Sequence, residues 1–234
     1  MPRIFGRSPE ARIIVMEDLQ GARDMTSLYA GDAPVATEID ALARYLAALH
    51  GGTAGDPDPR LANRAMRALN HEHVFRIPLD PANGLDLEAF EPGLGEAGRR
   101  LAADPGFTRR AEETGARYLA DGRHLVHGDY FPGSWLRTPD GPKIIDPEFG
   151  HFGAPELDLG VAIAHLALAA RPADEAERLL ARYRDHPAAP ATEVVRRLIG
   201  VAQLPIPPSR GRRAALLGRA REAMLADHHG ALFA

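Results

Sequence analysis

Residues 125–160 read LVHGDYFPGSWLRTPDGPKIIDPEFGHFGAPELDLG, and this segment carries the motifs that indicate the fold. The segment opens with a short apolar strand, Leu125 to Val126, which leads into the irregular sequence His127 to Ser134. Two more short strands, Trp135 to Arg137 and Lys143 to Asp146, are predicted around a turn rich in proline and glycine. Loops held by short buried strands are common places for catalytic groups, so we expect the functional site here.

Three acidic residues in this segment follow the order that phosphoryl transfer requires. Asp129 comes just after the first strand, and Asp146 and Glu148 come at the end of the hairpin. In that chemistry an aspartate accepts the proton of the substrate hydroxyl, and later groups hold magnesium on the ATP phosphates. On a straight strand Asp146 and Glu148 would point to one face and share a metal, and Pro147 favours extended backbone at Asp146.

The overall composition excludes several classes of protein. The chain has 234 residues, 45% hydrophobic and 26% charged, with a formal net charge of -4 and no cysteine. This balance is typical of a globular protein, provides no cationic field for nucleic acid, and excludes disulfides and thiolate chemistry. No apolar run is long enough for a signal peptide or a membrane span, so we expect a cytoplasmic protein. The oligomeric state stays open.

Most of the remaining sequence has helical periodicity, which predicts an α+β fold that is mostly α. Residues 2–5 and 12–16 are predicted to form a β-hairpin, residues 78–95 a loop, and Gly122 the C-cap of the helix before it. Helices are predicted over residues 38–52, 60–69, 108–120, 157–170, 173–184, 192–201 and 210–226.

These motifs resemble the protein-kinase-like small-molecule phosphotransferases, the aminoglycoside phosphotransferase and choline kinase group, and within it methylthioribose kinase. The resemblance lies in His127-Gly128-Asp129, in Gly133-Ser134, and in Asp-Pro-Glu-Phe at residues 146–149. It extends more loosely to residues 63–78 and to the paired arginines of residues 195–200.

The resemblance implies ATP and Mg²⁺ as cofactors and a small hydroxyl compound as substrate. It implies Asp129 as the catalytic base and Asp146 and Glu148 as magnesium ligands. Further roles are implied for the nucleotide side (Met16, Glu17, Asp18 and Ser134), for bracing the catalytic loop (His127 and Asp158), and for the phosphoryl or substrate side (Arg196 and Arg197). Asp158 is equally suited to capping the helix that follows it. Because adjacent helical residues diverge by about 100°, we expect only one of the two arginines to face the site.

The sequence departs from the family pattern at the substrate side. Tyr130, Phe131 and Pro132 stand where Leu-His-Thr is usual, and Gln203 stands where a histidine is common. The acceptor therefore stays open between a methylthioribose-like sugar, an aminoglycoside and another small alcohol.

An N-terminal kinase lobe is not recognisable upstream of the catalytic loop. It would carry a glycine-rich loop and a strand lysine, but Lys143 is the only lysine and follows Asp129. We therefore expect residues 1–18 to be the remnant of that lobe and its hinge, and residues 19–234 to be the helical lobe. A truncated gene or a truncated gene model would explain this organisation, and we expect the activity of the chain to be impaired.

Two other functions are compatible with the sequence. One is a non-catalytic remnant that acts as a binding module. The other is a metal-dependent hydrolase, in which His71 and His73 flank Glu72 on a possible strand and join His127 and Asp129.

Overall fold

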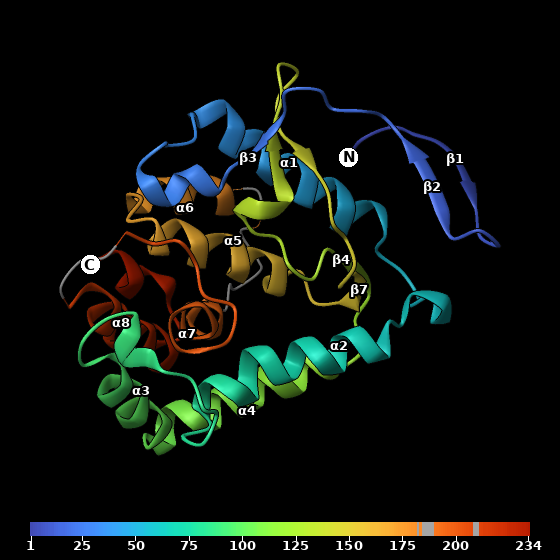
Figure 1. Cartoon of the computed structure of the whole chain (residues 1–234). Helices are drawn as coiled ribbons and strands as arrows, with labels where there is room; N and C mark the ends of the chain where they lie inside the picture. Colours follow the sequence, from blue (N-terminus) through green and yellow to red (C-terminus); the bar gives the residue numbers. More distant parts are fainter. Residues whose placement is uncertain (182, 184–189, 208–210) are drawn as a thin grey trace.

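The computed structural model of the chain describes residues 1–181, 183, 190–207 and 211–234, and it is mostly helical (Figure 1). The predicted α+β fold with a helical majority is confirmed. The helices are α1 (Ala36–Gly52), α2 (Arg64–His71), α3 (Leu94–Ala102), α4 (Pro105–Leu119), α5 (Glu156–Leu168), α6 (Ala173–Leu180), α7 (Ala191–Ile199) and α8 (Arg212–Ala226). The predicted helix ends at Arg184 and Arg210 lie outside the described residues.

The strands form three small antiparallel sheets. They are β1 (Ile4–Ser8) with β2 (Ile13–Met16), β4 (His124–Val126) with β7 (His151–Gly153), and β3 (Arg23–Asp24), β5 (Trp135–Arg137) and β6 (Lys143–Ile144) in the order β3-β5-β6. Leu125 pairs with Phe152, and Trp135 pairs with Ile144. The segments before and after the predicted site are thereby held by backbone hydrogen bonds on both sides.

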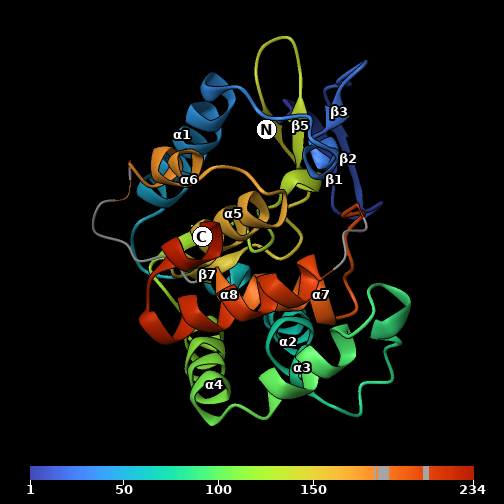
Figure 2. The ribbon, with the colours of Figure 1, turned by 90° about the vertical axis from the view of Figure 1, so that its left-hand side faces the viewer.

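Helix α5 runs through the centre of the molecule, with α1 and α6 on one side and α7 and α8 on the other (Figure 2). Its sequence is almost wholly apolar, as expected for a helix buried on all faces. Ala164 and Leu168 pack into the core shared with α7 and α8, whereas Leu159 and Ala162 pack into the core shared with α1. None of the helices in the described ranges combines the length and apolar character needed to cross a membrane.

Several predicted element boundaries are wrong between residues 60 and 102. The second helix begins at Arg64 because Asn63 adopts a left-handed backbone, with φ of 45°. The strand predicted around Glu72 is instead a π-helical turn, Glu72–Arg76, which continues α2 and buries Val74 and Phe75. The predicted loop also ends two residues too late, because Leu94 already begins α3.

Gly122 is not a helix cap. Helix α4 ends at Leu119, and the extended backbone of Ala120 leads the chain towards β4. Gly122 donates its N–H to the Phe152 carbonyl at 3.1 Å, and a Cβ added there would lie 2.1 Å from the Gly153 carbonyl oxygen. The absence of a side chain at residue 122 is therefore what allows α4 to run into the β4-β7 pair.

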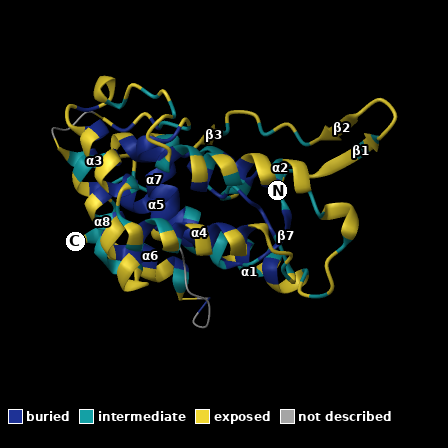
Figure 3. Ribbon diagram, turned by 90° about the horizontal axis from the view of Figure 1, so that it is seen from below, coloured by how far each residue is buried: buried dark blue, intermediate teal, exposed yellow. Residues whose placement is uncertain are grey.

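The hairpin β1-β2 projects from the helical body and is exposed on both faces (Figure 3). Successive strand residues point to opposite faces, yet Phe5 is 62% exposed, Ile14 60% and Val15 54%. Another layer of protein packed on the hairpin would remove the apolar surface of these side chains from water. The hairpin therefore keeps apolar side chains in contact with solvent on both faces.

Replacing Gly122 by alanine is expected to lower the free energy of unfolding by about 1–3 kcal/mol, because the added methyl group overlaps backbone that cannot easily move. Gly51→Ala in α1, where a Cβ meets nothing within 4 Å, is the matched control. It is expected to be neutral or to stabilise by up to about 1 kcal/mol. Urea unfolding of both variants measures the difference, and equal effects would contradict this account of Gly122.

Replacing Phe5 and Ile14 together by serine is expected to raise solubility without lowering the melting temperature, since neither side chain is buried. Leu42→Ser, in a fully buried position of α1, is expected to destabilise the chain strongly and serves as the control. Light scattering and thermal melting of the variants provide the measurement. A large fall in melting temperature for the hairpin variant would mean that the strands are covered in solution.

Candidate active site

Asp129 lies in the loop that leaves β4 and enters β5 through the short turn Pro132–Ser134. Gly128 just before it has φ of 87°, and a Cβ there would lie 2.3 Å from the Phe149 carbonyl oxygen. Only glycine fits both this backbone and this close approach. The loop of Asp129 is consequently packed directly against the segment that carries Asp146 and Glu148.

Asp158 connects this loop to α5. Its Oδ2 accepts the backbone N–H of His127 at 2.7 Å, and its Oδ1 accepts that of Gly128 at 2.9 Å. His50 of α1 lies 3.0 Å from Oδ2. Burial raises the pKa of Asp158, but the hydrogen bonds and charges of His50 and His127 outweigh it, so that the pKa is lowered overall. The residue preceding α5 is Pro155 and makes no side-chain cap, so the Asp158 carboxylate serves the loop.

His127 connects the same loop to the segment that follows β6. Its Nε2 lies 2.8 Å from the Ile145 carbonyl oxygen, which can only accept, so Nε2 carries the proton. Its Nδ1 is buried and has no hydrogen-bond partner in the part of the chain that is described. The ring therefore positions the loop from one side, beside the residue that precedes Asp146.

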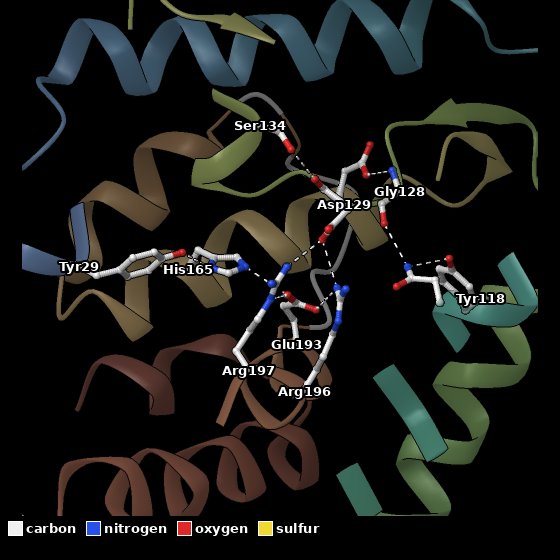
Figure 4. Close-up of polar contacts among 11 residues, drawn as sticks. Tyr29, Tyr118, Gly128, Asp129, Ser134, His165, Glu193, Arg196 and Arg197 are labelled. Atoms are coloured by element: carbon white, nitrogen blue, oxygen red, sulfur yellow. Dashed lines mark hydrogen bonds and ion pairs between the residues drawn. The ribbon is translucent and has the colours of Figure 1, made fainter. Parts of the chain in front are cut away.

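Arg196 and Arg197 both face Asp129, and the prediction that only one of them does so is wrong (Figure 4). Arg196 Nη1 lies 3.1 Å and Arg197 Nη2 3.0 Å from the same oxygen, Asp129 Oδ1. Both arginines are 5% exposed. Their Cα atoms do diverge around α7, but the long side chains bend back because Glu193 lies one turn earlier and binds both guanidinium groups. The Phe131 ring lies 4.6 Å from the Arg197 guanidinium carbon and packs against it.

The charges of this cluster stabilise one another. Burial opposes the charged form of Arg196, yet Glu193 and Asp129 raise its pKa above the ordinary arginine value. Burial likewise raises the pKa of Glu193, but Arg196, Arg197 and His165 outweigh it and hold that pKa well below the usual glutamate range. Arg196 and Glu193 therefore stay ionised at neutral pH.

Asp146 and Glu148 do not lie on a straight strand. Strand β6 ends at Ile144, and Asp146 adopts a left-handed backbone with φ of 64°, against the extended backbone expected before Pro147. The following turn, closed by Gly150 N–H to the Pro147 carbonyl at 2.9 Å, overrides that local preference. Both carboxylates are exposed, and neither has a hydrogen-bond or ion-pair partner among the described residues. They are free hard-oxygen donors, which suits Mg²⁺ held by one or two carboxylates plus phosphates.

The residues expected on the nucleotide side are not brought together. Ser134 is buried, and its hydroxyl donates to the Asp129 carbonyl at 3.3 Å, so it faces its own loop. Met16, Glu17 and Asp18 instead lie at the base of the N-terminal hairpin. There Glu17 accepts the Arg3 N–H through Oε2 at 3.0 Å.

The histidine cluster of the hydrolase alternative does not form. His71 lies at the end of α2 with its ring against Phe75 at 5.2 Å, and burial lowers its pKa. Within residues 1–181, 183, 190–207 and 211–234, no group of three histidine, aspartate or glutamate side chains could hold a metal.

Three residues of the site escaped the sequence analysis: Tyr29, His165 and Glu193. Tyr29 Oη lies 2.6 Å from His165 Nδ1, and His165 Nε2 lies 3.1 Å from Glu193 Oε1. The available signals were a lone histidine in the apolar sequence of α5 and a glutamate three residues before Arg196. Neither signal identifies its partner, because the three residues come from distant parts of the chain.

Comparison of the sequence with known proteins identifies a family. The sequence model of the phosphotransferase enzyme family (APH) matches residues 2–196. Methylthioribose kinase of Exiguobacterium sibiricum is 36% identical over 93 residues, 40% of this chain and 24% of that protein. Methylthioribose kinase of Bacillus cereus strain G9842 is 27% identical over 189 residues, 76% of this chain and 47% of that protein. This chain thus spans between about a quarter and a half of the length of these relatives.

Comparison with solved structures also gives matches to two kinases. Glucosamine kinase in crystal form A gives a TM-score of 0.49 at 20% identity, over 100% of this chain and 64% of that chain. Choline kinase LicA from Streptococcus pneumoniae gives 0.41 at 17% identity, over 97% and 65%. The family match covers most of the sequence, including the loop of Asp129 and the turn of Asp146 and Glu148, and so this chain belongs to the phosphotransferase enzyme family.

Proposed function

We propose that this chain carries the catalytic lobe of an ATP-dependent kinase that phosphorylates a hydroxyl of a small, sugar-like substrate related to methylthioribose. The observation that carries the proposal is the state of Asp129. Its Oδ1 is held by Arg196 and Arg197, whereas its Oδ2 has no partner in the described part of the chain. A carboxylate with one oxygen anchored and the other free is suited to accept a proton from a positioned hydroxyl.

The proposed reaction is an in-line displacement at phosphorus. The substrate hydroxyl oxygen forms a bond to the γ-phosphorus of ATP, the bond to the bridging oxygen of ADP breaks, and the hydroxyl proton passes to Asp129 Oδ2. Asp146 and Glu148 would hold Mg²⁺, which when bound neutralises charge on the phosphates. The residues of the chain orient the base and balance its charge, and no covalent enzyme intermediate is needed.

A second feature supports a nucleotide beside this site. An open cavity of about 990 Å³ is lined, among others, by Arg23, Asp24, Thr26, Gly133 and Ile145. Gly133 belongs to the catalytic loop, and Ile145 directly precedes Asp146, so the cavity adjoins both predicted functional segments. We propose that ATP enters from this side.

The N-terminal hairpin is part of the proposal. Residues 1–18 would belong to an N-terminal lobe and its hinge, with Met16, Glu17 and Asp18 as the hinge, and residues 19–234 would form the helical lobe. The exposed apolar side chains on both faces of the hairpin support this division, because strands of a larger sheet would cover them.

Asp129→Asn is expected to lower turnover by about 10²- to 10⁴-fold, because the amide cannot accept the hydroxyl proton as a base. The fold should survive, since the asparagine oxygen can still accept hydrogen bonds from both arginines. Asp140→Asn, on the exposed turn between β5 and β6, is the control with unchanged turnover. ADP release in a screen of methylthioribose, glucosamine and aminoglycoside acceptors measures the effect, and normal turnover of the Asp129 variant would overturn its role.

Calorimetric titration with ATP tests the magnesium proposal. Wild-type protein is expected to bind ATP only with Mg²⁺ present, and the double variant Asp146→Asn, Glu148→Gln to bind at least about tenfold more weakly, about 1.4 kcal/mol. The Asp140→Asn variant should match wild type. Binding that is independent of magnesium, without phosphate transfer, would favour the non-catalytic binding module instead.

A further inference from the structure

Among the described residues, Glu193 and Asp129 are the two carboxylates that bind both arginines of the site. Glu193 Oε2 lies 3.2 Å from Arg196 Nη1, and its Oε1 lies 2.6 Å from Arg197 Nε. Glu193 is 3% exposed, so the carboxylate has given up nearly all its water. A buried carboxylate is stable only when hydrogen-bonded counter-charges replace that water. Its contacts with the two guanidinium groups satisfy this condition.

His165 gives Glu193 a further hydrogen bond without adding charge. Burial lowers the pKa of His165, so the ring is neutral at pH 7. The Glu193 carboxylate can only accept hydrogen bonds, so His165 Nε2 carries the ring proton and donates to it. His165 Nδ1 then accepts a hydrogen bond from the Tyr29 hydroxyl, whose oxygen lies 2.6 Å away. Tyr29 thereby selects the tautomer of His165 that donates to Glu193.

The charge balance shows why this arrangement matters for Asp129. Two guanidinium groups face two carboxylates, Asp129 and Glu193, so the buried cluster is neutral overall. Without Glu193, two buried cations would converge on a single carboxylate, and their repulsion would favour their separation. Arg196 Nε has no hydrogen-bond partner in the described structure, so carboxylates alone orient that guanidinium.

We propose that Glu193 is a positioning residue for the reaction, supported by His165 and Tyr29. It directs both arginines to Asp129 Oδ1 (Figure 4) and so leaves Oδ2 free for the hydroxyl of the proposed substrate. This inference rests on the proposed role of Asp129 as the base. Glu193 itself contacts neither the substrate nor the transferred phosphoryl group in this scheme.

The test compares Glu193→Gln with Glu91→Gln. Glu91 is a matched control because it is equally buried, at 4% exposure, and accepts backbone N–H groups of Arg213 and Ala214 at the start of α8. Turnover is measured well below each melting temperature, so that loss of folded protein does not contribute. NMR measures the exchange rate of the Arg197 Nε–H with solvent, which reports the arginine position without requiring activity.

Glu193→Gln is expected to lower kcat by about tenfold to a hundredfold, the scale of a misplaced catalytic group. The KM of the acceptor should change less than threefold, and Arg197 Nε–H exchange should become at least tenfold faster. Glu91→Gln should leave all three quantities unchanged even if it lowers the melting temperature. Glu193→Asp, which keeps the charge, should restore part of kcat.

Two results would overturn the proposal. One is wild-type kcat in folded Glu193→Gln, and the other is Arg197 Nε–H exchange as slow as in wild type. If wild-type protein shows no turnover with any acceptor, the proposed function fails. The exchange rates of the Glu193 and Glu91 variants still decide whether Glu193 positions the arginines.

Discussion

The buried carboxylate of Asp158 is the contact on which the arrangement of the site depends. It lies in the first turn of α5, the central helix, and accepts the backbone N–H groups of His127 and Gly128 while bonding His50 of α1. Removing it would leave two buried backbone donors and a histidine without their acceptor, at a cost of about 1–3 kcal/mol for each unsatisfied group. Helix α5, α1 and the loop of Asp129 are therefore held in one relative position by one side chain.

The second level of organisation is electrostatic. Asp158 places the loop, and the cluster of Glu193, Arg196 and Arg197 then sets the direction of the Asp129 carboxylate. Burying any one of these charges alone would cost a large desolvation free energy. That free energy is offset here because each cation contacts anions. A site built in this way is sensitive to the loss of any one member, whereas the exposed carboxylates of Asp146 and Glu148 are independent of it and available for a ligand.

The N-terminal hairpin differs from the rest of the molecule in the burial of its apolar side chains. The helical body buries its apolar side chains around α5, but β1 and β2 keep apolar side chains on both faces in water. A two-stranded hairpin has little stability alone, and in the described part of the chain no further layer covers its two faces. This contrast supports the boundary that we propose between the hinge and the helical lobe.

The sequence determined the helical majority, the three acidic positions and the family resemblance, because periodicity and motif order are properties of neighbouring residues. Local rules failed where tertiary contacts overrode them: Asp146 adopts a left-handed backbone despite Pro147, Gly122 makes room for Gly153, and residues 72–76 form a π-helical turn. Only the tertiary structure decided that Arg196 and Arg197 converge on Asp129. The same holds for the hydrogen bonds that link Tyr29, His165 and Glu193 to these arginines. The residues of that network are up to 168 positions apart, from Tyr29 to Arg197. Packing around α5 therefore sets their distances, and spacing along the chain does not.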